Sequence, residues 1–153
     1  MKILGLDVAT HTGFAICEDG KIIDSGVWDY SKVRGKDMHN GHIFNALKSN
    51  IASMFCSYDI DHVVYERSHF RGAASFLLVG MSTHVLSACA QWSIPVSDVH
   101  TLTLKKWVTG DGRASKADMM QRATEATGKV YESDDESDAV NLALYKWDML
   151  KGE

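Results

Sequence analysis

The stretch KILGLDVATHTGFAI, residues 2–16, decides how the rest of the chain folds. Its first half is rich in apolar β-formers, namely Ile3, Leu4, Leu6 and Val8. An edge strand would alternate these with polar residues, so the run predicts a central strand that is covered on both faces. We expect a turn over residues 10–13 and a second strand over residues 14–18.

Asp7 stands out in this strand because a carboxylate is costly to bury. Removing its charge from water costs several kcal/mol unless a cation, a metal ion or an array of donors meets it. One interpretation is that Asp7 only caps the turn that follows. We favour a functional site, since an Asp that caps a turn usually sits within the turn itself.

Length and composition indicate a soluble globular protein. The chain has 153 residues, of which 45% are hydrophobic and 24% charged, and we expect residues 1–153 to form a single domain. No apolar run is long enough to cross a bilayer, and the N-terminus enters the first strand without a signal-peptide pattern. We therefore expect a cytoplasmic protein that makes no membrane contact.

The three cysteines, Cys17, Cys56 and Cys89, are far apart and lie in apolar contexts. This spacing argues against a disulfide framework and against a thiolate zinc site, so we expect buried thiols. His39 and His42 have the spacing of a ligand pair, but no Cys or carboxylate follows at an interval typical of zinc.

After the second strand, the pattern predicts alternating strands and helices. Asp19-Gly20 is a hairpin signal that should lead into a third strand over residues 21–29. Further strands are expected over residues 61–66, beside the first strand, and over residues 94–99, near an edge because Pro95 cannot donate to a ladder. The prediction is an α/β fold with a five-stranded mixed sheet, three antiparallel strands followed by two parallel ones, flanked by helices.

The helices are predicted from apolar periodicity and from capping residues. One helix should carry an apolar face around residues 43–55, and a short one should cover residues 101–108. Ser115 is a good N-cap for the next helix, with Asp118 in its first turn. For the last helix, Ser133 and Glu136 fit a capping box.

The longest helical stretch, residues 71–91, has apolar side chains on more than one face. One face should pack on the sheet. For the other face we expect a partner subunit, and the alternative is a helix buried under a loop.

Basic residues are clustered although the formal net charge is −4. The clusters are Lys32, Arg34 and Lys36; Arg67 and Arg71; and Lys105, Lys106, Arg113 and Lys116. If the fold brings them together they can follow a phosphate backbone, and otherwise they are ordinary solvated faces. The sequence leaves both interpretations open.

Four carboxylates on three predicted elements point to metal-dependent chemistry. Asp7 lies on the central strand, Glu66 ends its neighbour, and Asp135 and Asp138 share one face of the last helix. The helix dipole explains acids at a helix start, but it fits Asp138, one turn deeper, less well. Converging carboxylates need cations between them, and oxygen ligands select Mg²⁺ or Mn²⁺. Two such ions are the usual device for phosphodiester hydrolysis.

These motifs, in this order, resemble the RuvC family of Holliday junction resolvases, within the RNase H-like superfamily. The opening ILGLD and TGFA resemble the family's first strands, and VVYE, ending at Glu66, resembles its second acidic strand. The segment LKKWVTGDGRASK, residues 104–116, is similar to a family segment rich in Lys and Gly, and Asp135-x-x-Asp138-Ala to the closing acidic pair.

The resemblance implies a homodimer, joined through the 71–91 helix, that binds a four-way DNA junction and nicks two strands symmetrically. It implies two Mg²⁺ ions per site, replaceable by Mn²⁺, held by the four acids. Lys116 would stabilise charge in the transition state, and Phe70 would be a wedge in the junction or an ordinary packed aromatic. The remaining expected DNA contacts are Lys105, Lys106, Arg113, Arg67 and Arg71.

The segment Arg67-Ser-His-Phe-Arg71 and the overall acidity depart from the bacterial pattern of the family. A phage-encoded or divergent member would fit them. Three alternatives stay open: a broader nuclease for flaps or other branched DNA, a nuclease for RNA–DNA hybrids, and a non-catalytic junction-binding module. Actin-like ATPases open with a similar strand, but they need two lobes, which 153 residues do not supply.

Overall fold

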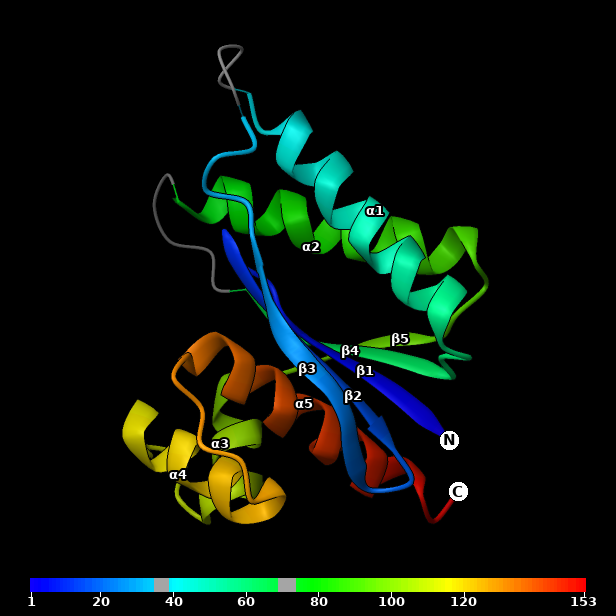
Figure 1. Cartoon of the computed structure of the whole chain (residues 1–153). Coiled ribbons are helices and arrows are strands. Elements are labelled where there is room, and N and C mark those ends of the chain that lie inside the picture. The colour runs from blue at the N-terminus through cyan, green and yellow to red at the C-terminus, as the bar shows by residue number, and fades with distance from the viewer. Residues whose placement is uncertain (35–38, 69–73) are drawn as a thin grey trace.

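A computed structural model describes residues 1–34, 39–68 and 74–153 of the chain. Within these residues, strands and helices follow one another as shown in Figure 1. They are β1 (Lys2–Asp7), β2 (His11–Glu18), β3 (Lys21–Asp29), α1 (Gly41–Ser57), β4 (His62–Glu66), α2 (Ala74–Gln91), β5 (Val96–Val99), α3 (Thr101–Thr109), α4 (Lys116–Thr127) and α5 (Asp134–Leu150).

The strands of the described chain form one mixed sheet in the order β3-β2-β1-β4-β5. The first three strands pair antiparallel, and β4 and β5 continue the sheet parallel to β1. The predicted sheet, with β1 at its centre, is confirmed. The edge position of β5 is confirmed too, and Pro95, just before it, only accepts a hydrogen bond through its carbonyl, from the Val63 N–H at 2.9 Å.

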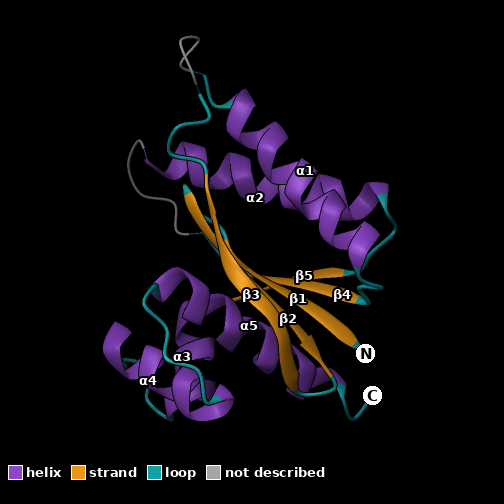
Figure 2. Ribbon diagram, viewed as in Figure 1, coloured by secondary structure: helices purple, strands orange, loops and turns teal. Residues whose placement is uncertain are grey.

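Helices cover both faces of the sheet, with α1 and α2 on one side and α3, α4 and α5 on the other (Figure 2). Successive side chains of β1 alternate between these two cores. Leu4 and Leu6 pack with Leu47 of α1, whereas Ile3 packs with Leu142 of α5. Because both faces of β1 are buried, the strand needs the unbroken apolar run that the sequence shows.

The turn after β1 lies earlier than predicted, and β2 already begins at His11. Thr12 closes the turn, since its hydroxyl donates to the Ala9 carbonyl at 2.5 Å and accepts from the Ala9 N–H at 3.3 Å. Gly13 is consequently a strand residue that pairs with Asp7. The hairpin at Asp19-Gly20 is as predicted, with positive φ angles of 48° and 84°.

Two smaller predictions were wrong. Ser133 is the N-cap of α5 but makes no side-chain capping hydrogen bond, and the Glu136 carboxylate, expected to reach back to Ser133, instead accepts from Ser25 and Lys129, each at 2.7 Å. Cys56 is exposed, since it lies off the buried row of α1, whereas the other two thiols are buried. None of the helices in the described ranges combines the length and apolar character that a membrane crossing requires.

Candidate active site

The four predicted carboxylates come together at one edge of the sheet. Asp7 is the last residue of β1 and Glu66 the last of β4. These strands are parallel neighbours, so their carboxyl ends meet, and the first two turns of α5 lie beside them. A cavity of about 370 Å³ is lined by Asp7, Glu66, Asp135 and Asp138, and also by Arg67, Lys116 and Asp134.

The backbone of α5 packs directly against the strands of the sheet at two glycines. A Cβ atom at Gly5 would lie 2.4 Å from the Ala139 carbonyl oxygen, and one at Gly13 would lie 1.8 Å from the Asp135 carbonyl oxygen. Only glycine fits at these two strand positions, and they fix how closely the acids of α5 approach Asp7. The sequence analysis missed this role, although a glycine inside a strand is a known sign of close backbone approach.

The cavity is unfavourable for the negative charges that it contains. The pKa of Asp7 is raised from 3.8 to about 9, mainly because burial removes its carboxylate from water. The charges of the other three acids are the next largest cause. Removal from water, and next the charge of Glu66, raises the pKa of Asp138 to about 7. The pKa of Asp135 is raised as well, again mainly by removal from water. The site therefore favours protons or cations over free carboxylates.

The donor set fits hard divalent cations, since all four side chains supply carboxylate oxygens, the preferred ligands of Mg²⁺ and Mn²⁺. Their mutual effect on pKa shows how strongly they repel one another when no counter-charge lies between them. Over the described ranges, however, no three His, Cys, Asp or Glu side chains are already gathered around one ion position. The fit therefore rests on donor chemistry and electrostatics.

Two predicted basic residues lie beside the acidic cluster. The Lys116 ammonium group lies 3.0 Å from a carboxylate oxygen of Asp134, and its side chain is 83% exposed. Lys105 and Lys116 line a second, smaller cavity that adjoins Glu66 and Asp138. The sequence analysis explained acids at the helix start by the dipole alone, so it missed the pairing of Asp134 with Lys116.

The other predicted DNA contacts lie around the site or outside the described residues. Arg67 lines the acidic cavity and forms two hydrogen bonds with Asp98 of β5, at 2.8 and 3.3 Å. Lys106 on α3 and Arg113 in the loop before α4 are exposed. Phe70, Arg71 and Lys36 lie outside the described residues.

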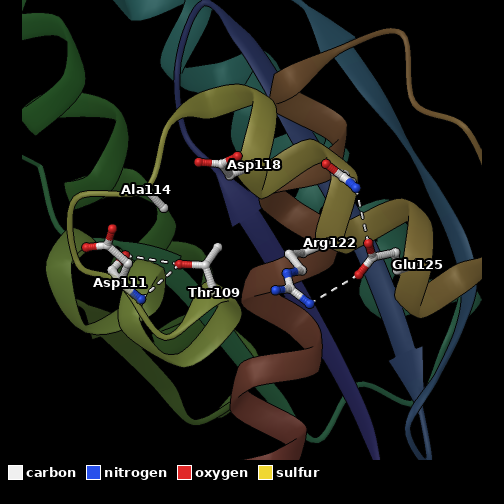
Figure 3. A pocket seen from close by; sticks show the side chains of 7 residues that line it. Thr109, Asp111, Ala114, Asp118, Arg122 and Glu125 are labelled. Carbon is white, nitrogen blue, oxygen red and sulfur yellow. Dashed lines mark hydrogen bonds and ion pairs between the residues drawn. The ribbon is translucent and has the colours of Figure 1, made fainter.

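A separate cavity of about 260 Å³ lies between the α3–α4 loop and α4 (Figure 3). Its polar groups are satisfied locally. Arg122 pairs with Glu125 at 3.2 Å, the Thr109 hydroxyl accepts from the Asp111 N–H at 3.1 Å, and the Asp118 carboxylate accepts from the Ser115 N–H at 3.1 Å. This cavity therefore differs from the acidic one, in which carboxylates repel one another.

No family model matches the chain, but comparison with known proteins finds relatives of one kind. The crossover junction endodeoxyribonuclease RuvC of Caldicellulosiruptor saccharolyticus is 27% identical over 154 residues, covering 94% of this chain and 90% of the relative. That of Gloeobacter violaceus is 28% identical over 153 residues, covering 96% and 88%. Over nearly its whole length the chain is therefore similar to RuvC proteins.

Solved structures show the same fold. Thermus thermophilus RuvC superposes with a TM-score of 0.81 at 16% identity, covering 99% of this chain and 97% of that one. The same protein in complex with a Holliday junction substrate gives a TM-score of 0.80 at 14% identity, covering 98% and 96%. The RNase H-like fold expected from the resemblance is therefore confirmed.

We expect the Asp7→Asn variant to be more stable than the wild-type protein at pH 8 without divalent ions. Because the pKa of Asp7 is raised, its contribution to folding is fully present below about pH 4 and is lost as the pH rises toward 9. Asparagine carries no charge and escapes this loss. The gain should be roughly 2 kcal/mol, or about 4–8 °C in Tm, by calorimetry in EDTA between pH 5 and 8.5.

The matched control is Asp59→Asn, which changes an exposed acid outside the cavity. Its Tm should follow that of the wild-type protein at every pH. If the Tm of Asp7→Asn also follows the wild-type curve, burial of the Asp7 charge does not destabilise the folded protein.

Proposed function

We propose that this protein is a structure-specific endodeoxyribonuclease that resolves four-way DNA junctions. The observation that carries the proposal is the convergence of four carboxylates at the ends of β1 and β4 and the start of α5. It is supported by relatives named crossover junction endodeoxyribonuclease, and by the fold shared with a RuvC that was solved with a Holliday junction. We take residues 1–153 to be a single nuclease domain.

Asp7, Glu66, Asp135 and Asp138 would hold two Mg²⁺ ions, or Mn²⁺ in their place. When bound, such ions supply an activated water and neutralise charge on the leaving oxygen. Bound cations would favour the ionised forms of Asp7 and Asp138, because they would offset the removal from water and the repulsion that raise the pKa values of these two acids. At Gly13 the backbone of Asp135 lies directly against β2, and this close approach sets where the start of α5 lies relative to Asp7.

The basic residues would bind and orient the DNA backbone. Lys105 and Lys116 line a cavity with Glu66 and Asp138 and would contact the scissile phosphate. Lys116 would exchange Asp134 for the phosphate and stabilise the charge that develops there. Lys106, Arg113, Arg67 and Arg71 would contact other phosphates of the DNA, and Phe70 would wedge into the junction.

The second face of α2 supports a homodimer. Phe76, Val79, Thr83 and Leu86 form one stripe along the helix, opposite a buried row that includes Met81 and Val85. Phe76 is 75% exposed and Leu86 43% exposed. The stripe continues into a cavity of about 260 Å³ that reaches Tyr65 of β4 and Asp98 of the edge strand β5. We propose that a second copy covers this stripe and supplies the second active site for symmetric nicking.

The first test is cleavage of end-labelled DNAs with Mg²⁺: a four-way junction, a linear duplex, a three-way junction, a flap and an RNA–DNA hybrid. We expect paired symmetric nicks in the four-way junction only. Asp7→Asn should bind the junction within about threefold of wild type while its cleavage rate falls by roughly a thousandfold, because ligand loss removes the chemistry and not the contacts.

Each other outcome names a different function. Equal cutting of flaps or hybrids would indicate a broader nuclease of the same fold. Junction binding without cleavage by the wild-type protein would indicate a binding module. Undiminished cleavage by Asp7→Asn would contradict the assignment of the acids.

Replacing Lys116 with alanine should lower turnover by roughly 10–100-fold while junction affinity changes less than about threefold, since the ammonium group acts on charge that develops during the reaction. Single-turnover cleavage and junction binding, measured separately, check this. Lys21→Ala, an exposed lysine at the start of β3, is the control and should change neither. A loss of affinity alone would reduce Lys116 to a positioning contact.

Leu86→Glu should convert the dimer into a monomer, because it places a charge in the apolar stripe of α2. Light scattering after gel filtration should move from twice the chain mass of 16.9 kDa to that mass. The control is Val130→Glu, which changes a residue that is 78% exposed between α4 and α5. A variant that stays dimeric would place the interface elsewhere.

A further inference from the structure

Thr101, the first residue of α3, is bonded directly to the acidic site. Its hydroxyl donates a hydrogen bond to Oε1 of Glu66 at 2.5 Å, across 35 positions of sequence. Both residues also line the small cavity that contains Lys105, Lys116 and Asp138. We infer that Thr101 is a positioning residue that fixes the Glu66 carboxylate for metal binding, an inference that rests on the proposed function.

The backbone around Thr101 leaves its hydroxyl little freedom. Strand β5 pairs in parallel with β4, with Glu66 opposite Val99, and the Arg67 N–H donates to the Val99 carbonyl at 2.9 Å. Helix α3 begins two residues later. His100 caps it, since its ring nitrogen accepts from the Leu102 N–H at 3.2 Å. The sheet and the helix start together hold the hydroxyl beside the end of β4.

A neutral donor suits this position. The charge of Glu66 raises the pKa of both Asp7 and Asp138, so the carboxylate adds to the repulsion in the cavity. A hydroxyl donates a hydrogen bond to the carboxylate without adding a positive charge that would compete with a cation. This bond uses Oε1 and does not itself occupy Oε2, the other carboxylate oxygen that could bind a metal ion.

Two nearby cations are engaged with other acids. Lys116 pairs with Asp134 at 3.0 Å, and Arg67 pairs with Asp98 at 2.8 Å. Partners that orient a metal-binding side chain are typically worth 10–100-fold in metal affinity or activity. The Thr101 hydroxyl is placed to have an effect of this kind on Glu66.

The test compares Thr101→Val, which removes the hydroxyl but keeps the shape, with Thr101→Ser, which keeps the hydroxyl. Mn²⁺ binding is measured by electron paramagnetic resonance without DNA, and junction cleavage is measured over a range of Mg²⁺ concentrations. We expect Thr101→Val to weaken Mn²⁺ binding and lower turnover, each by about tenfold. Thr101→Ser should recover to within about threefold, and metal-free junction affinity and Tm should not move.

Two controls separate positioning from a structural role. Thr103→Val changes an exposed threonine of the same helix and should behave as the wild-type protein. In a Glu66→Gln background, Thr101→Val should cause no further loss of Mn²⁺ binding, because the carboxylate that it orients is gone. An equal loss in both backgrounds, or a Thr101→Ser variant as deficient as Thr101→Val, would overturn the inference.

The Mn²⁺ measurement also separates this inference from the proposed function. If the wild-type protein binds Mn²⁺ but cuts no junction, the proposed function fails while the binding data still decide the role of Thr101. If the wild-type protein binds no Mn²⁺, or if Thr101→Val binds it normally, the role of Thr101 is overturned.

Discussion

The direct contact between the backbone of α5 and the strands β1 and β2 is the constraint on which the rest of the structure depends. At Gly5 and Gly13 a side chain would collide with carbonyl oxygens of α5, at 2.4 and 1.8 Å respectively. Without side chains there, the helix sits deep enough to bring Asp135 and Asp138 to the end of β1. The same contact buries Leu142 and Ala143 against the central strands, so packing and the site share one cause.

This arrangement brings like charges together in a buried place, which is electrostatically unfavourable. Removal from water, together with the charges of the other acids in the cavity, raises the pKa of Asp7 to about 9 and that of Asp138 to about 7. A fold selected only for stability would not gather them, since apolar residues of similar size would cost less. The repulsion among these acids is useful to a protein that must bind cations and polarise a phosphodiester, because bound cations offset it.

Much of the fold could be predicted from local sequence because its signals act over a few residues. The apolar run of β1, the Asp19-Gly20 turn and the Ser115 cap each set one element through nearby atoms. Such signals failed where distant atoms compete. Glu136 fits a capping box, but its carboxylate accepts from Lys129 and from Ser25, which is 111 positions away. The turn after β1 was placed too late for a different, local reason, because the Thr12 hydroxyl closes it on the Ala9 carbonyl.

The candidate site, too, could be predicted from the sequence only in part. The sequence alone determined which acids and lysines were available, and placed Asp7, Glu66, Asp135 and Asp138 on three elements that a parallel strand pair and one helix can bring together. Only the tertiary structure decided which groups touch them. It paired Lys116 with Asp134 and set the Thr101 hydroxyl on Glu66. Those contacts join residues 18 and 35 positions apart, and their existence depends on how strands and helices pack, which no local pattern encodes.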